Sequence, residues 1–139
     1  MNSFLANVFA KKLGDKISYK EYQQAIEAHT DWKFRLIRVI HGRENLARLS
    51  AEDWGCPHHC ALGKWLNSDE NKHLSTHRDF LRLVDVHTHF HQQAAKTLQM
   101  AQAHQGRDVM LQLSHHGDFE KASMELIRCL HRLHRSSLE

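Results

Sequence analysis

The sequence predicts an all-α protein, an antiparallel four-helix bundle in which one short helix carries a cysteine. Apolar residues recur at three- and four-residue steps along almost the whole chain, which is the period of an α-helix. The 139 residues include 6 glycines and 1 proline, too few for the frequent turns of an all-β domain. This length fits one domain, and the brief connections between periodic segments favour antiparallel neighbours.

The first long helix is expected over residues 18–49. Ser18 can cap its start, and Glu21 three residues later completes a capping box. Gly42 is a weak point inside this helix because glycine lowers helix propensity. The seam that should face the core consists of Tyr22, Ala25, His29, Trp32, Leu36, Val39 and Leu46.

A short second helix is expected over residues 57–67. The single proline, Pro57, stands where a helix would have its first residue, a position that tolerates the missing N–H group. Cys60 would then lie in the first turn. The polar stretch after Asn67 is typical of a turn.

Two further long helices are expected over residues 71–104 and 108–133. Gly106 stands where a left-handed residue would end the third helix, and Asp108 can cap the fourth. Gly117 is a weak point in the fourth helix that the pattern does not explain.

The composition argues against several classes of function. The formal charge of +3 comes from 19 basic and 16 acidic residues with interspersed signs, which does not indicate nucleic acid or a membrane surface as partner. No apolar run approaches the roughly 20 residues of a membrane span. The odd number of cysteines, 3, does not form a disulfide framework, so we expect reduced thiols and a cytoplasmic protein.

The N-terminal segment, residues 1–17, is interpreted as an amphipathic lead-in to a domain at 18–135. It lacks the basic start and the cleavage pattern of a signal peptide. Its apolar residues favour burial against a partner, as in a homodimer; they are Phe4, Leu5, Val8 and Phe9.

Three of the 14 histidines occupy seam positions: His29, His87 and His91. A buried imidazole without a partner costs about 1–3 kcal/mol, so something should compensate. His87 and His91 are four residues apart, which places them on one helix face about 6 Å apart, where both can reach one metal ion. The pair His73 and His77 has the same spacing, so the spacing alone is a weak signal.

Cys60 strengthens the metal hypothesis. At the start of a helix, free N–H groups favour the thiolate, which is the form that binds metal. Three histidines and one cysteine form a closed tetrahedral set, which suits structural or sensory zinc. Cys129 is interpreted as a core residue. For Cys56, a disulfide with Cys60 or a second metal at this place both stay open.

These residues resemble the chemoreceptor zinc-binding (CZB) domain. The family pattern is a His closely followed by an aromatic residue, a Cys leading into L/F-G-x-W, and a later H-x-x-x-H. This chain has His29-Thr-Asp-Trp32, Cys60-Ala-Leu-Gly63-Lys-Trp65 and His87-Thr-His-Phe-His91, in that order. The resemblance covers residues 20–135, and the cysteine motif is its most specific part.

The resemblance implies a zinc ion held by four ligands in an often dimeric helical bundle, with Trp32, Gly63 and Trp65 beside them. The implied ligands are His29, Cys60, His87 and His91. Such domains occur in bacterial cytoplasmic chemoreceptors and diguanylate cyclases, where zinc occupancy or oxidation of the zinc-bound thiolate alters signalling. No methyl-accepting hairpin or cyclase domain is present in these residues, so the output would lie in a partner or in another part of a longer protein.

Two other metal-dependent functions share part of this pattern. A hemerythrin-like di-iron protein also contains H-x-x-x-H, but there H-x-x-x-E comes first, whereas here His116 and Glu120 come later. A thiolate moreover favours zinc over a di-iron carboxylate site. A zinc enzyme would need an open coordination position, and Thr88 stands where the glutamate of H-E-x-x-H would be. We therefore expect no enzymatic activity.

Overall fold

The structure, a computed structural model, describes residues 17–42 and 45–138, and these contain helices and turns but no strand. The all-α prediction is confirmed. The expected lead-in over residues 1–17 lies outside the described part except for Ile17, which is buried. Among the described helices, none combines the length and the apolar character that crossing a bilayer requires.

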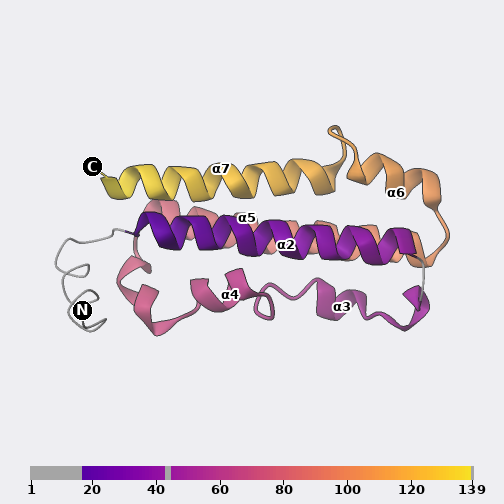
Figure 1. Ribbon diagram of the computed structural model, residues 1–139, viewed down its shortest axis with the longest axis horizontal. Coiled ribbons are helices and arrows are strands. Elements are labelled where there is room, and N and C mark those ends of the chain that lie inside the picture. Colours follow the sequence, from indigo (N-terminus) through magenta and orange to yellow (C-terminus); the bar gives the residue numbers. More distant parts are fainter. Residues whose placement is uncertain (1–16, 43–44, 139) are drawn as a thin grey trace.

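Three long helices lie side by side along the molecule (Figure 1): α2 (Tyr19–Gly42), α5 (Arg78–Gln102) and α7 (Asp118–Leu138). The chain runs in the same direction along α2 and α5 and returns along α7. Between α2 and α5 it also returns, through the short helices α3 (Ala51–Trp54) and α4 (Ala61–Leu66).

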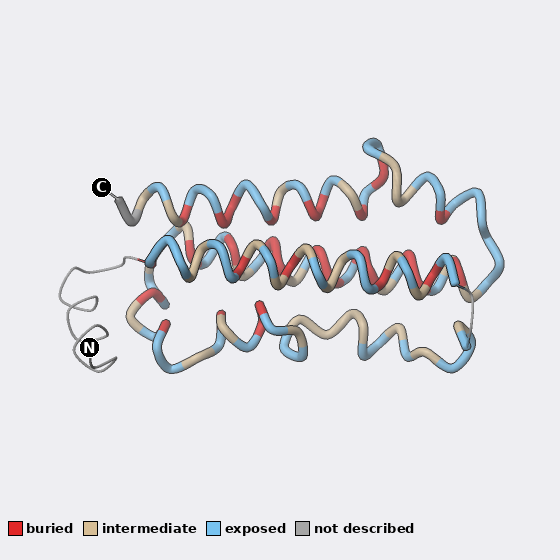
Figure 2. The backbone as a smooth tube through the Cα atoms, viewed as in Figure 1, coloured by how far each residue is buried: buried red, intermediate tan, exposed pale blue. Residues whose placement is uncertain are grey.

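The core lies between the three long helices, and α5 packs most extensively against α7. Figure 2 shows the buried positions as regularly spaced bands on the faces that these helices turn toward one another. The buried residues of α7 follow helical spacing: Phe119, Ala122, Ser123, Leu126, Cys129, Leu130 and Leu133. Burying one such large apolar side chain contributes about 1.5–3 kcal/mol.

The predicted capping box is present at the start of α2. The Glu21 backbone N–H donates to Ser18 Oγ, and the Ser18 backbone N–H donates to Glu21 Oε1, both at 3.0 Å. The other oxygen of this carboxylate accepts a hydrogen bond from Trp65 Nε1 at 3.3 Å. The cap therefore also ties α4 to the start of α2.

The first predicted helix, 18–49, is wrong at its C-terminal end, because α2 ends at Gly42. Asn45 has a left-handed backbone with φ 59°, which a continuing right-handed helix does not allow. The chain reverses through a short 3-10 turn at Leu46–Arg48. Gln102 at the end of α5 stabilises this turn. Its Nε2 donates hydrogen bonds to the carbonyls of Leu46 and Leu49 at 2.9 and 2.7 Å.

The second predicted helix, 57–67, starts later than expected. Pro57 lies in a turn, α4 begins at Ala61, and Cys60 is its N-cap with an extended backbone. This turn passes closely over Gly63, and the position requires glycine because a Cβ atom there would overlap the Pro57 carbonyl.

The third predicted helix, 71–104, is also shorter than expected. A 3-10 segment at Asp69–Leu74 comes first, and α5 then begins after His77, whose Nδ1 accepts from the Asp79 backbone N–H at 3.1 Å. After α5 the left-handed residue is His104, φ 60°, rather than Gly106.

The fourth predicted helix, 108–133, divides in two. The first part is α6 (Gly106–Leu113), so Asp108 lies inside its first turn and not at its cap. The division explains Gly117, because a Cβ atom there would overlap the carbonyl oxygens of Leu111 and Gln112. The Gln112 side chain accepts from the Phe119 backbone N–H at 3.2 Å and so caps the start of α7.

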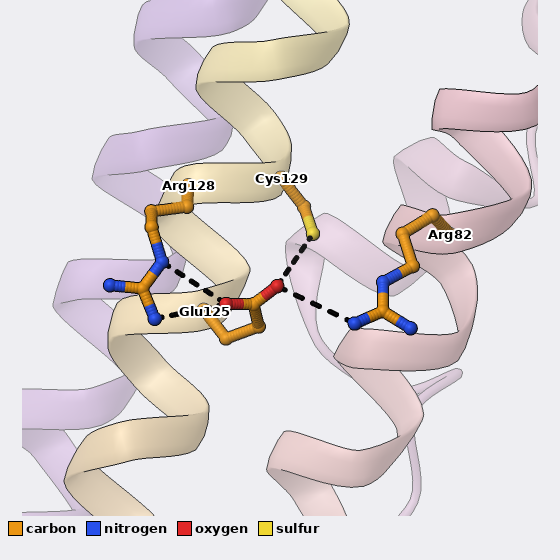
Figure 3. A network of polar contacts seen from close by, with 4 residues as sticks. All are labelled: Arg82, Glu125, Arg128 and Cys129. Carbon is orange, nitrogen blue, oxygen red and sulfur yellow. Dashed lines mark hydrogen bonds and ion pairs between the residues drawn. The ribbon is translucent and has the colours of Figure 1, made fainter.

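A polar network fastens the outer side of the α5–α7 contact (Figure 3). Glu125 accepts two hydrogen bonds from Arg128, at 3.1 and 2.9 Å, and pairs with Arg82 of α5 at 3.6 Å. Cys129, which is 2% exposed, donates from Sγ to the same carboxylate at 3.7 Å. This cysteine is a core residue, as predicted.

We predict that Gly117→Ala destabilises the fold by about 1–3 kcal/mol, the usual cost of forcing extra atoms into a packed place. Chemical denaturation would measure the free energy of unfolding. Gly106→Ala is the control, because no atom lies within 4 Å of the Cβ it would add. Equal stabilities of the two variants would contradict this account of Gly117.

Candidate metal centre

Three side chains with metal-binding atoms converge between α4 and α5. The sulfur of Cys60 lies 3.2 Å from Nε2 of His87 and 3.4 Å from Nε2 of His91. All three ligand atoms lie within 4.8 Å of one another. The two histidines are 3% and 2% exposed, while Cys60 is half-buried.

Local structure explains why these atoms meet. His87 and His91 are one helical turn apart on the buried face of α5, as the spacing predicted. Cys60 comes from the start of α4, where its sulfur accepts the Gly63 backbone N–H at 3.2 Å. The extended backbone of this N-cap position lets the side chain turn back over its own helix.

A backbone carbonyl fixes the orientation of His91. Its Nδ1 lies 2.9 Å from the carbonyl oxygen of Trp54. Because a carbonyl can only accept, Nδ1 carries the proton, which leaves the lone pair of Nε2 free to face Cys60. Trp32 packs edge-on against the same imidazole, with ring centres 4.5 Å apart, and also contacts Trp54.

Burial sets the protonation of all these groups. Desolvation lowers the pKa of His29 and of His87 to about 3, and it lowers the pKa of His91 against the opposing effect of the Trp54 carbonyl. The imidazoles are therefore neutral near pH 7, the form that binds metal. Desolvation raises the pKa of Cys60, because it outweighs the backbone N–H groups that favour the thiolate. The helix start alone thus does not produce a thiolate, and a neighbouring cation is needed.

The donor set and its spacing fit zinc. Zinc prefers sulfur and imidazole nitrogen, at about 2.3 and 2.0–2.1 Å in a tetrahedron, which separates the sulfur from each nitrogen by about 3.6 Å. The observed separations of 3.2 and 3.4 Å are close to this value. The three atoms would need little movement to accept the ion.

His29, the fourth ligand expected from the sequence, lies beside this group but outside it. It is 2% exposed on α2, and its ring packs against Phe90 with centres 4.6 Å apart. Its Nε2 lies 2.8 Å from the hydroxyl of Ser123 on α7. Ligation by His29 therefore stays a prediction.

The other residues singled out from the sequence occupy different places. Trp65 is half-buried and donates to Glu21, so it links α4 to α2. His77 caps α5 and belongs to no metal-binding group among the described residues. Cys56 is a free thiol that lines one surface cavity together with Cys60 and Trp32.

Two contacts of the centre were missed in the sequence. The Trp54 carbonyl left no signal, because any residue supplies a carbonyl. Ser123 did leave one: it is a polar residue within the apolar stripe of α7 and is completely buried. A search for polar residues on that stripe would have found it.

The fold and the centre together define a helical domain with a buried thiol–imidazole group suited to zinc. The family model of the chemoreceptor zinc-binding (CZB) domain matches residues 29–98, half of the chain, and the chain belongs to this family. The match extends over His29, Cys60, His87 and His91. No curated protein and no solved structure matches the chain.

We predict that Gly63→Ala weakens metal binding about 10- to 100-fold, the range typical for supports of a metal ligand. The added Cβ would overlap the Pro57 carbonyl oxygen, and the resulting shift would move the adjacent Cys60 sulfur away from the imidazoles. Titration with cobalt(II), followed by thiolate-to-metal absorption, would measure the affinity. Gly42→Ala, with no atom within 4 Å of its Cβ, should bind normally; equally normal binding by Gly63→Ala would contradict the prediction.

Proposed function

We propose that this chain is a zinc-binding sensory domain in which His29, Cys60, His87 and His91 hold the ion. The observation that carries the proposal is the convergence of one sulfur and two imidazole nitrogens at 3.2–3.4 Å in a buried position. We further propose that the domain is an antiparallel four-helix bundle whose second member is the broken segment that contains α3 and α4.

Bound zinc supplies a positive charge that links helices and holds the Cys60 thiolate. Its ligands would come from α2, α4 and α5, so zinc binding would contribute to the packing of these elements. Removing the ion leaves neutral groups that hold one another weakly, and the short α4 is the element that should loosen first. An element whose packing depends on a metal can serve as a switch.

The proposed output is a diguanylate cyclase or a chemotaxis-type signalling unit, in the same protein or in a partner. Membership in the chemoreceptor zinc-binding domain family supports this class of output. We propose a cytoplasmic homodimer as the working form, in keeping with the family resemblance and the apolar residues of the segment 1–17.

A binding role suits this centre better than catalysis. Four protein ligands would fill the tetrahedron and leave no position for substrate. A di-iron function is not favoured, because the metal-binding group found in the described residues consists of a thiol and two imidazoles and has no carboxylate. Bridging carboxylates are what a hemerythrin-like centre would require.

Metal analysis tests the proposal directly. Protein purified without chelator should contain about one zinc per chain, and Cys60→Ala or His87→Ala should contain much less, because each variant removes one of the four proposed ligands. His89→Ala is the matched control: His89 is on the same helix but exposed, so its loss should leave the zinc content unchanged. Wild-type zinc well below one per chain would refute the proposal.

We also predict that hypochlorite releases the zinc. The half-buried Cys60 lines a surface cavity, through which a small oxidant can reach its sulfur. Oxidation to the sulfenic acid makes it a poorer ligand. A chromogenic chelator would record the release. Cys60→Ser loaded with excess zinc should release no additional zinc on hypochlorite treatment, because it lacks the oxidised sulfur.

Cys56→Ser and Cys129→Ser serve as controls for this oxidation. Both should release zinc as the wild type does, because neither sulfur belongs to the metal-binding group. Protection by Cys56→Ser would show that Cys56 is the oxidised thiol and would contradict the prediction.

A further inference from the structure

The His29–Ser123 hydrogen bond is a buried polar contact between two helices. The donor and acceptor atoms, His29 Nε2 and Ser123 Oγ, are 2.8 Å apart and come from residues 94 positions apart in the chain. The two residues are 2% and 0% exposed, so water does not compete for either group. A hydrogen bond this short and shielded from water stabilises the packing of α2 against α7.

This contact engages the same ring nitrogen that the other two histidines direct at the sulfur. His87 and His91 both direct Nε2 toward the Cys60 sulfur, whereas the Nε2 of His29 is directed at Ser123. An imidazole nitrogen has one position for either a proton or a lone pair. It cannot bind a metal ion and keep its hydrogen bond to the hydroxyl.

We propose that Ser123 is a latch on His29: zinc binding transfers the His29 Nε2 from the Ser123 hydroxyl to the ion. The proposal rests on the proposed function, since it takes zinc as the ligand of this centre. Ser123 is then a positioning residue that lowers zinc affinity by stabilising His29 in its unligated position. It also makes α7, which contributes no ligand, sensitive to zinc occupancy.

Two other contacts join α2 to α7 and do not involve His29 or Ser123. Lys33 of α2 pairs with Glu120 of α7 at 2.7 Å, one turn from the latch. On the other side, the Tyr22 hydroxyl lies 3.4 Å from Nδ1 of His131. In the proposed exchange, these two contacts would keep α2 packed against α7 while the His29 ring rotates. The released Ser123 hydroxyl can donate to the carbonyl four residues earlier on its own helix.

The cost of opening the latch predicts the size of the effect. A neutral buried hydrogen bond of this kind changes an equilibrium by about three- to tenfold. Ser123→Ala removes the competing hydroxyl without adding atoms and suits a helix. The variant should therefore bind zinc about three- to tenfold more tightly than the wild type, as measured by competition with a chelator of known affinity.

Thr97→Val is the control for losing a buried hydroxyl. Thr97 is 0% exposed and donates to the Gln93 carbonyl of its own helix, away from the latch. Its affinity for zinc should equal that of the wild type. Circular dichroism of each variant would confirm that the helices are intact.

A double-mutant cycle separates the latch from a general effect on packing. In a His29→Ala background, Ser123→Ala should no longer change zinc affinity, because the group on which Ser123 acts is gone. An unchanged affinity of the single variant Ser123→Ala, or an equal gain in both backgrounds, would overturn the latch. A weaker affinity would also overturn it and would show that Ser123 orients His29 during ligation.

The outcomes distinguish this inference from the proposed function. If His29→Ala binds zinc as tightly as the wild type, the latch is refuted, while Cys60, His87 and His91 still form a zinc site. If the wild type binds no zinc at all, both proposals fail.

Discussion

Desolvation of a small polar group inside an apolar core is the constraint on which this structure depends. The three histidines are 2–3% exposed and lie among leucine, phenylalanine and tryptophan side chains. Burial lowers the pKa of His29 and His87 to about 3 and raises the pKa of the Cys60 thiol. The protein thus keeps four potential ligands uncharged, in a place where a divalent cation would bind them more strongly than their present hydrogen-bond partners do.

The irregular segment between α2 and α5 is what brings the Cys60 sulfur to the histidines of α5. A regular helix over 57–67 would start at Pro57 and place Cys60 within its first turn. In the observed turn, the chain folds closely over Gly63, and Cys60 becomes an extended N-cap whose sulfur reaches α5. The preceding α3 contributes as well, since it ends at Trp54, whose carbonyl orients His91. The irregular segment therefore supplies both the sulfur of the centre and the carbonyl that orients His91.

The parts predictable from sequence are those set by local patterns. Helical periodicity identified the all-α class, the i,i+4 spacing put His87 and His91 on one face, and the Ser18–Glu21 capping box is observed as predicted. The helix ends were misplaced where distant contacts decide them: Gln102 fastens the reversal after α2, and the crowding at Gly117 divides the fourth helix. The present partner of His29 could not be deduced either, because Ser123 is 94 residues away and nothing local pairs them.

Helix α7 lies outside the matched part of the chain and packs on two of the helices that carry the predicted ligands. The family match ends at residue 98 and contains all four predicted ligands, while α7 begins at Asp118. Yet α7 packs more extensively against α5 than any other element does, and it meets α2 through buried or nearly buried polar pairs. A rearrangement of the proposed ligands on α2 and α5 would therefore change both surfaces against which α7 packs. Because packed interfaces of this kind shift between discrete arrangements and do not deform smoothly, α7 is the element through which a change at the centre would reach the rest of the molecule.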